Sequence, residues 1–400
     1  MFKFDYKVVD SQGKTEKGLI EARNARQAAK ILHHQHYLVV DLIPHQSNLL
    51  TDLSQQLQRV SQDEVVNFTR QFSTMITAGL PLTQALSLIE DQASGPFRQI
   101  ISETLKEIEE GGSLFESLSK HQNIFGSVYL ALIHAGEVSG SLDRVLSRLA
   151  DTLEKQREFR AKIKGALVYQ VIVIAGMIIV SIIMMVAVVP KMTSMYADFG
   201  TDLPAPTKLL MAISSLMSHF WWLIPLVALG GFLGLKTALK NPSLAFLLDQ
   251  RLLHFPIIGK LRQQTIIAEF ARTLGLLVGT GILLVEALET VKNTLASLVF
   301  QQAVAQVVED VQKGLPLAVS LAKTEVFPPV VTQMVSIGEE TGKIDEILSR
   351  VANYFEQQAD YSVKNLTTAI EPLIMVVLGV GVGFLMISMI MPMYSLTSKF

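Results

Sequence analysis

Two short acidic phrases in this chain repeat one another and carry the residues best suited to chemistry. Residues 134–150 read HAGEVSGSLDRVLSRLA, and residues 336–352 read SIGEETGKIDEILSRVA. Both contain the frame G-E-x-x-G-x-x-D. Its members are Gly136, Glu137, Gly140 and Asp143 in the first copy and Gly338, Glu339, Gly342 and Asp345 in the second. Carboxylates in such a frame suit three roles: charge at helix ends, contact with a partner protein, and binding of a hard cation.

The first role needs only the local chain and is the best supported. A Gly–Glu pair ends one helix, a hydroxyl of Ser139 or Ser141 (Thr341 in the second copy) caps the next, and the aspartate is favoured by the dipole of that helix. A partner contact is the second role, because an exposed carboxylate at a helix corner suits recognition. The cation is the least supported, since two carboxylates fall short of the roughly 6–8 oxygens that calcium takes.

The phrase is part of a longer internal duplication. Residues 202 positions apart match without a gap from Phe68 to the end of the first apolar stretch. The pairs are Phe68 with Phe270, Arg70 with Arg272, Gly79 with Gly281, Gly112 with Gly314, Phe125 with Phe327 and Lys162 with Lys364. This period far exceeds the roughly 20–50 residues of solenoid repeats, so the pattern indicates a duplicated domain.

Each copy has a helical pattern, whereas the first 44 residues do not. Phe68, Phe72 and Ile76 recur at a spacing of four, and Gly79 then ends the run. Residues 1–44 alternate apolar and polar side chains in FKFDYKVV, TEKGLIEA and YLVVDLIP, with a helical stretch ARQAAKILHHQ before the last of these. We therefore expect a small ββαβ module joined to the first copy by a linker, 45–60.

Composition indicates a membrane protein. Half of the residues are hydrophobic and 18% are charged, against about 25% in soluble domains. Charge-free windows at 165–190, 209–235 and 372–398 are each long enough to cross a bilayer, and we place the second span at 220–239. Lys and Arg gather before the first window and after the second, so we expect the N-terminus and both helical domains to be cytoplasmic and the C-terminus periplasmic. The middle span brings the chain back to the cytoplasmic side, so that both copies have the same orientation in the membrane.

The sequence thus predicts a mainly α membrane protein with two homologous cytoplasmic helical-bundle domains, three transmembrane helices and a small N-terminal ββαβ module. The predicted boundaries are 1–44 for the module, 45–60 for the linker, 61–164 for the first domain, 165–190 for the first span, 191–219 for a periplasmic loop, 220–239 for the second span, 240–371 for the second domain and 372–395 for the third span.

Several classes of function lack the residues they need. The chain has no cysteine and a net charge of −2, which removes Cys-based sites and any basic nucleic-acid surface. No P-loop, H-E-x-x-H or G-x-S-x-G motif is present, so we expect no enzyme, cofactor or metal site. His33, His34 and His36 read as a solvated helix end, and GVGVGF at 379–384 reads as close helix packing inside a span. The interiors of the predicted spans carry no Asp, Glu, Lys or Arg, which argues against a pump.

Taken together, the DSQGKTEKGLIEA turn, the opening FTRQFSTMITAGLPLTQAL, the repeats and the paired AGEVSGSLD and IGEETGKID resemble the inner-membrane platform protein of type IV pilus and type II secretion machines. The resemblance covers almost the whole chain. It implies a place in the bacterial inner membrane and contact between the cytoplasmic domains and a hexameric assembly ATPase. It also implies that pilin or pseudopilin subunits are guided into a filament, with other inner-membrane assembly proteins and further copies of the chain as partners.

We therefore expect a non-enzymatic platform that couples the ATPase to pilin handling, with a pilus role slightly preferred over secretion. The main alternative is an oligomeric permease built on parallel repeats, although three spans per chain are few for a pore. An intramembrane enzyme is a further alternative, disfavoured by the apolar spans. The sequence does not separate pilus from secretion, name the pilin or cargo, or fix the oligomeric state.

Overall fold

The computed structural model describes residues 2–9, 15–22, 38–44, 60–190, 205–220, 226, 230–231, 234, 236–237, 241–256 and 258–397. The chain divides into two compact units. One comprises residues 1–61 with 90–100, and the other comprises residues 62–89 with 101–400. The second of these holds both copies of the acidic phrase.

The N-terminal residues form a three-stranded antiparallel sheet. Its strands are β1 (Phe2–Val9), β2 (Thr15–Ala22) and β3 (Leu38–Pro44), in the order β2-β1-β3. All three lie where the alternation of apolar residues predicts strands. The helix expected between β2 and β3, the three histidines and the linker lie outside the described residues, so the complete ββαβ module stays a prediction.

The helices repeat with the offset found in the sequence. The first copy has α3 (Gln62–Thr77), α4 (Leu82–Gln92), α5 (Gly95–Glu109), α6 (Leu114–Ser119), α7 (Gln122–Phe125), α8 (Ser127–Ser139) and α9 (Leu142–Ile183). The second has α14 (Ile258–Gly279), α15 (Leu284–Lys292), α16 (Leu298–Gln312), α17 (Leu317–Lys323), α18 (Pro329–Thr341) and α19 (Ile344–Thr397). Helices α15, α18 and α19 begin 202 residues after α4, α8 and α9, so the duplication is one of structure as well as sequence.

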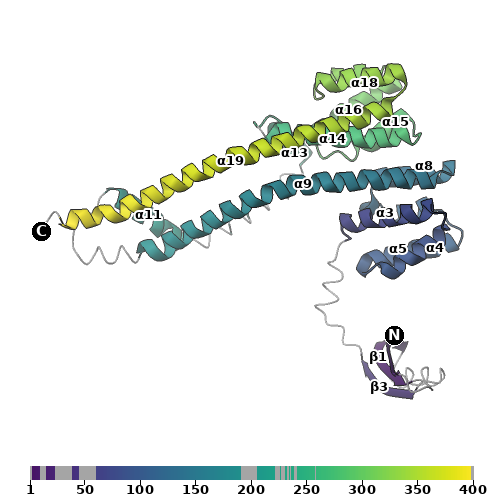
Figure 1. Cartoon of the computed structure of the whole chain (residues 1–400), viewed down its shortest axis with the longest axis horizontal. Helices are drawn as coiled ribbons and strands as arrows, with labels where there is room; N and C mark the ends of the chain where they lie inside the picture. The colour runs from purple at the N-terminus through teal and green to yellow at the C-terminus, as the bar shows by residue number, and fades with distance from the viewer. Residues whose placement is uncertain are drawn as a thin grey trace. The chain divides into compact units, whose positions relative to one another are not determined.

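The last helix of each copy is much longer than the others. Helices α9 and α19 run side by side, and each passes without a break from its bundle into an apolar half (Figure 1). A π-helical turn, Met184–Val188, continues α9. Leu142–Val188 and Ile344–Ser388 are long and apolar enough to cross a membrane. The second predicted span falls mostly outside the described residues and stays a prediction.

A further helix lies where the sequence predicts a loop. Residues 205–219, part of the stretch 191–219 expected as a loop, belong to α11 (Ala205–Phe220). Thr207 Oγ1 donates a hydrogen bond to the Ser388 carbonyl (2.8 Å), and Ser214 Oγ donates one to the Met185 carbonyl (2.5 Å). The Met185 carbonyl belongs to the π turn, and the Ser388 carbonyl belongs to α19. Helix α11 therefore ties the far ends of α9 and α19 together.

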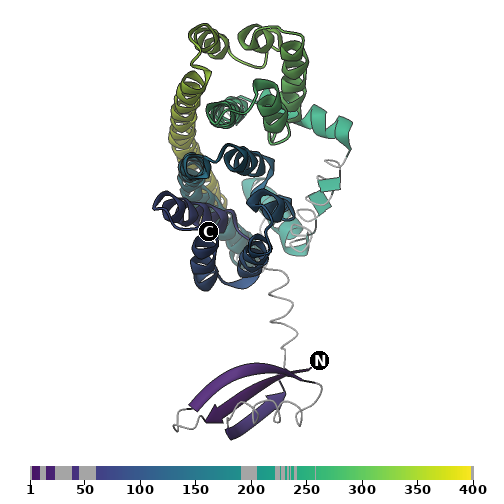
Figure 2. The same cartoon turned by 90° about the vertical axis from the view of Figure 1, so that its right-hand side faces the viewer.

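Equivalent aromatic residues hold the two bundles together internally. Phe68 and Phe125 lie with ring centroids 6.1 Å apart, and their counterparts Phe270 and Phe327 lie 4.9 Å apart. All four are buried. Seen along the long helices, the green helices of the second copy and the blue helices α3, α8 and α9 of the first form two separate groups (Figure 2). Each copy therefore has its own core, and the contact between copies is a separate feature.

Candidate functional site

The acidic phrase forms the sharp corner between a short helix and the long one that follows it. Gly140 ends α8 with φ +65°, and Gly342 ends α18 with φ +68°. The amide of Ser141 donates to the Gly136 carbonyl (3.0 Å), and the amide of Lys343 donates to the Gly338 carbonyl (2.9 Å). This is the Schellman arrangement, in which a glycine in the left-handed region closes the helix end. The helix ends are therefore made by Gly140 and Gly342, whereas the Gly–Glu pair expected to end each helix lies within its last turn.

The first glycine of each phrase lies where the short helix contacts the long helix that follows it. A Cβ atom built on Gly136 would lie 3.2 Å from Val145 Cβ and 3.3 Å from Leu142 Cα. A Cβ atom on Gly338 would lie 3.2 Å from Ile347 Cβ and 3.3 Å from Ile344 Cα. Since both glycines are buried, they let the two helices of each corner pack closely where they cross.

The glutamate of each phrase caps a helix elsewhere in its own bundle. Glu137 accepts hydrogen bonds from the amides of Leu114 (2.6 Å) and Phe115 (2.9 Å) at the start of α6. Glu339 accepts them from Leu317 (2.5 Å) and Ala318 (2.9 Å) at the start of α17. A carboxylate in this place satisfies amides that have no partner within the helix and complements its dipole. Both oxygens of each glutamate are therefore engaged inside the domain.

The hydroxyls behave differently from the prediction. Ser139 Oγ donates to the Ala135 carbonyl (2.6 Å), and Thr341 Oγ1 donates to the Ile337 carbonyl (2.6 Å). Ser141 makes no side-chain capping bond to α9. The expectation that Ser139 or Ser141 caps α9 is thus wrong, because these side chains bond within the corner, back toward the preceding helix or to one another.

The two aspartates lie in the first turns of their helices but in different surroundings. Asp143 is exposed at the start of α9, whereas Asp345 is half-buried at the start of α19. Asp345 Oδ2 would be 3.2 Å from a Cβ atom on Gly279, and Arg148 Nη1 would be 2.8 Å from the same point. Among the described residues, no group of three or more His, Asp or Glu side chains is placed to hold a metal ion.

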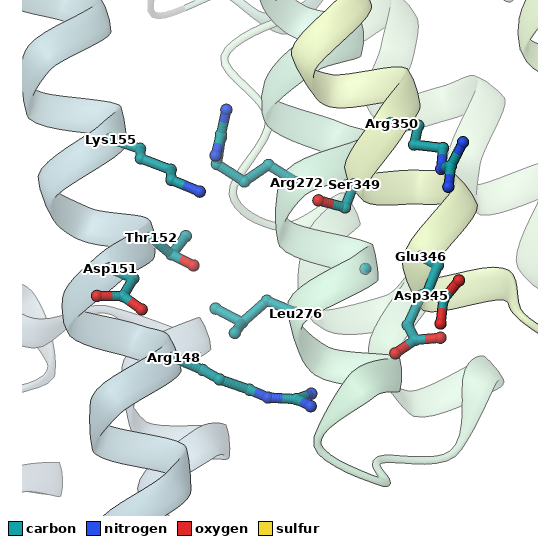
Figure 3. Close-up of a pocket in the computed structure, with 11 residues that line it drawn as sticks. Arg148, Asp151, Thr152, Lys155, Arg272, Leu276, Asp345, Glu346, Ser349 and Arg350 are labelled. Atoms are coloured by element: carbon teal, nitrogen blue, oxygen red, sulfur yellow. The ribbon is translucent and has the colours of Figure 1, made fainter.

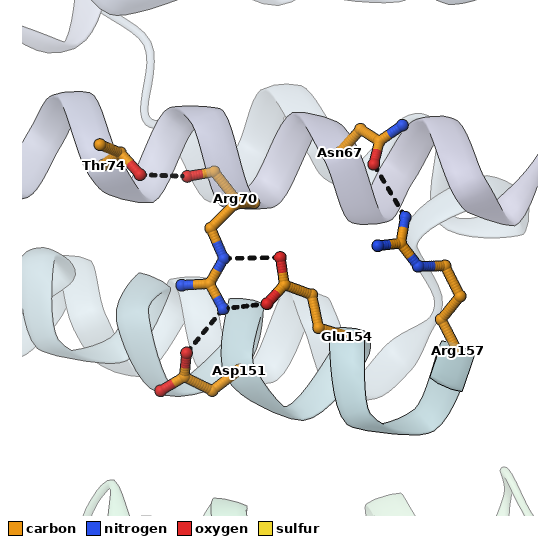
Figure 4. A network of polar contacts seen from close by, with 6 residues as sticks. All are labelled: Asn67, Arg70, Thr74, Asp151, Glu154 and Arg157. Atoms are coloured by element: carbon orange, nitrogen blue, oxygen red, sulfur yellow. Dashed lines mark hydrogen bonds and ion pairs between the residues drawn. The ribbon is translucent and has the colours of Figure 1, made fainter. Parts of the chain in front are cut away.

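An arginine of α3 that pairs with two carboxylates of α9 stabilises the first bundle. Arg70 of α3 donates from Nε to Glu154 Oε1 (2.7 Å) and from Nη2 to Glu154 Oε2 (2.5 Å) and Asp151 Oδ1 (2.6 Å), as Figure 4 shows. The hydrogen bond that Arg70 donates holds the pKa of the Glu154 carboxyl below its usual range, and donating to Glu154 and Asp151 raises the pKa of Arg70. In the second bundle the equivalent Arg272 pairs with Glu356.

A charged cavity of about 490 Å³ opens between the two copies. Its lining comes from α9 on one side and from α14 and α19 on the other (Figure 3). Four basic side chains line it, Arg148, Lys155, Arg272 and Arg350, together with three acidic ones, Asp151, Asp345 and Glu346. Arg148 Nη1 crosses it to donate a hydrogen bond to the Gly279 carbonyl (2.5 Å). Of the predicted site residues, the structure thus brings Asp345 alone to the contact between copies.

Further charge pairs continue this contact toward the apolar halves of the long helices. Arg160 Nη2 and Gln156 Nε2 of α9 donate to Glu269 Oε1 of α14 (3.2 and 3.0 Å). Lys162 of α9 pairs with Asp360 of α19. Arg160 and Lys162 lie in the basic stretch EKQREFRAKIK before the first apolar window, and Asp360 lies in the more acidic stretch EQQADYSVKNLTTAIE before the third. What the sequence does not show is that the two stretches lie against each other.

Comparison with known families finds the same duplication. The profile described as "Type II secretion system (T2SS), protein F" matches residues 68–190 and again 270–392. The profile described as "Type II secretion system protein F, N-terminal domain" matches residues 1–43. The two matches of the first profile are offset by the same 202 residues as the phrase.

Relatives over nearly the whole length belong to two kinds of machine. The chain is 37% identical to the type IV pilus assembly protein PilC of Thermus thermophilus over 98% of each chain. It is 38% identical to PilC of Pseudomonas aeruginosa, over 85% of this chain and 91% of the relative. It is also 33% identical to the type II secretion system protein F of Xanthomonas campestris, over 99% of this chain and 98% of the relative.

Proposed function

Because the chain belongs to the protein F family of inner-membrane platforms in type II secretion and type IV pilus machines, we propose that it couples a cytoplasmic assembly ATPase to the incorporation of pilin or pseudopilin subunits. The relatives named for pilus assembly and for secretion have similar identities. The proposal therefore covers both machines and names neither cargo. It assigns the chain no catalytic step of its own.

One observation carries the proposal: each corner is joined to the membrane by a single rigid element. At 1.5 Å per residue, the part of α9 from Leu142 to Gly165 measures about 35 Å, and the part of α19 from Ile344 to Pro372 about 42 Å. A push at the corner therefore reaches the apolar half without passing through a loop. Long unbroken helices suit transmission of a rigid-body motion.

The contact between the copies is suited to movement. It is formed by ion pairs and the charged cavity rather than by continuous apolar packing. Interfaces of this polar kind within one chain commonly allow relative motion of domains. We therefore propose that a load on one bundle shifts α9 against α14 and α19.

The exposed part of the first corner is the proposed ATPase contact. Val138, near the end of α8, is 76% exposed, and Asp143, in the first turn of α9, is also exposed. The remaining members, Gly136, Glu137 and Gly140, position this surface, and the second corner, Gly338 to Asp345, does the same for a different neighbour. At the position equivalent to Val138 the second copy has Glu340. The two corners thus offer different chemistry.

The test is reconstitution of the full chain in proteoliposomes with the assembly ATPase of its own machine. We expect the ATPase to co-sediment with the vesicles and its turnover to change. The variant Val138→Glu, which gives the first corner the residue of the second, should abolish both effects, whereas the matched change Glu340→Val should leave ATPase binding intact. Unchanged binding and turnover in the Val138→Glu and Asp143→Asn variants would rule out this surface, and ATP hydrolysis by the chain alone would contradict a non-catalytic role.

A further inference from the structure

A helix of the second domain has an exposed apolar face that the bundle does not use. This helix is α13 (Pro242–Leu253), which precedes α14. Leu244 and Leu247 lie one turn apart on one face, here called the leucine face, which Arg251 shares; Leu252 lies at its edge, and Phe255 follows just beyond the helix end. Each of the four apolar residues is between 44% and 58% exposed. Such a face on a soluble surface would be an open apolar patch.

The opposite face of α13 is fixed to the bundle by a buried carboxylate. Asp249 is 5% exposed and accepts hydrogen bonds from Ser297 Oγ (2.6 Å) and the Val299 amide (3.1 Å) at the start of α16. It also pairs with Arg262 of α14 (2.5 Å). Because Asp249 and the buried Ala245 point into the domain, the leucine face must point away from it.

The turn after α13 leaves little freedom. A Cβ atom on Gly259 would lie 2.2 Å from the Leu253 carbonyl oxygen, closer than real Cβ atoms come. The Gly259 amide donates to the Phe255 carbonyl (2.8 Å). The direction of the leucine face is therefore set by the bundle and not by a flexible joint.

The helix lies at the end of the bundle nearest the predicted membrane. Helix α14 is antiparallel to α19, since Arg272 pairs with Glu356 and Ser362 Oγ donates to Gln264 Oε1 (2.7 Å). Following this pairing along both helices brings the start of α14 level with the last turn before Glu371, the final charged residue ahead of the apolar half of α19. Along the molecule in Figure 1, α13 comes at the same level.

The charges around the exposed face have one sign. Arg251 and Lys260 are exposed, whereas Asp249, the one carboxylate of α13, is buried in its ion pair. A helix with an apolar face and basic flanks is typical of helices that lie in the surface of an anionic bilayer.

We propose that α13 lies in the cytoplasmic surface of the membrane, with Leu244, Leu247, Leu252 and Phe255 among the acyl chains and Arg251 and Lys260 at anionic headgroups. This helix holds the second bundle at a fixed distance and orientation to the bilayer. The inference rests on membrane insertion of α9 and α19, and it does not depend on the ATPase.

The chain lacks cysteine, so single cysteines can be placed and labelled without a background. The full chain would carry a fluorophore at Leu247→Cys, in vesicles of phosphatidylethanolamine and phosphatidylglycerol with a fraction of acyl-chain spin-labelled lipid as quencher. Val138→Cys reports an exposed site far from the membrane, and Ile179→Cys reports the apolar half of α9.

We expect loss of fluorescence at Leu247 and Ile179 and little loss at Val138. Quenching at Ile179 with none at Leu247 would overturn the inference while leaving the inserted spans intact. Absence of quenching at Ile179 would overturn both. Burial of Leu247 that grows with protein density, without lipid quenching, would assign the face to a second copy of the chain and contradict a lipid contact.

Discussion

The two corners have the same backbone arrangement, but different side chains cap the helices α6 and α17 that their glutamates contact. In the first copy, Glu137 binds the amides of Leu114 and Phe115, and Ser113 Oγ accepts from the next amide, that of Glu116 (3.0 Å). In the second copy, the position of Leu114 is taken by Pro316, which has no amide hydrogen. Glu339 accordingly binds one residue further along and has no serine to assist it. A single proline has thus made the second corner depend more on its glutamate.

The copies also differ where they meet. The first contributes a basic helix face, with Arg148, Arg160 and Lys162, and the second contributes carboxylates and carbonyls that receive it. Arg70 is held by two carboxylates, whereas Arg272 has Asn353 at the place of Asp151. After duplication, the copies have become complementary to each other while keeping the same internal framework.

The largest expected effect comes from a feature that the copies share. Gly136→Val and Gly338→Val each force a branched side chain against a neighbouring helix, and overpacking of this kind costs about 3 kcal/mol. Thermal unfolding of the purified full chain in detergent should show a similar loss for both. If one variant unfolded like the parent chain, its corner would not be packed as described.

The second prediction separates the corners. Glu339→Ala should lower the free energy of unfolding by about 2 kcal/mol, since it leaves two helix-end amides without acceptors. Glu137→Ala should cost about 1 kcal/mol, because Ser113 still caps α6. Denaturant unfolding of the full chain measures both. The double variant Ser113→Ala, Glu137→Ala should then match Glu339→Ala; equal costs for the two single variants would refute the division of capping.

The third prediction concerns pH. The pKa of Glu154 is lowered in the folded chain, mainly by the hydrogen bond from Arg70. Its contribution to stability is therefore present above the unfolded pKa of about 4.3 and is lost as the pH falls through the lower folded value. Arg70→Met should reduce stability at neutral pH by at most about 1 kcal/mol, because the pair is partly exposed, and should flatten the acid limb of the stability curve. An unchanged acid limb in this variant, with Lys106→Met as control, would contradict the assignment.

The smallest expected effect comes from adding to the second copy a carboxylate that the first copy has. Asn353→Asp gives Arg272 the second carboxylate position that Arg70 has in the first copy. We expect a gain of about 0.5 kcal/mol in denaturant unfolding, in the usual range of exposed ion pairs. Asp151→Asn, the matched change in the first copy, should produce a loss of similar size. A gain from Asp151→Asn would mean that the two arginines have different environments beyond this residue.

Much of the framework follows from the sequence because it is local. Gly79 and Gly140 end helices where the predicted pattern stops, and the exact register of the repeat follows from matched residues such as Phe68 and Phe270. Helix ends of this kind depend on a few neighbouring residues. The family match confirms the duplication over both copies.

The parts that were missed depend on contacts between distant residues. Glu137 reaches an amide 23 residues earlier, and Arg148 reaches a carbonyl 131 residues later, so no local pattern reports either bond. Helix α11 was expected as loop because serines dilute its apolar pattern, yet Ser214 is what binds the π turn. One signal was available: the starts EGGSLFES and QKGLPLAV recur in register ahead of the two glutamates.

The central claim is that α9 and α19 must shift against each other while the machine works. The most direct test places cysteines at Lys162→Cys and Asp360→Cys, a pair in contact across the copies, and joins them in cells with a short bismaleimide. The account predicts that the cross-linked protein stays in the membrane but assembles no filaments, while each single-cysteine variant treated with the same reagent assembles them normally. Normal filament output from the fully cross-linked protein would show that the two copies act as one rigid body.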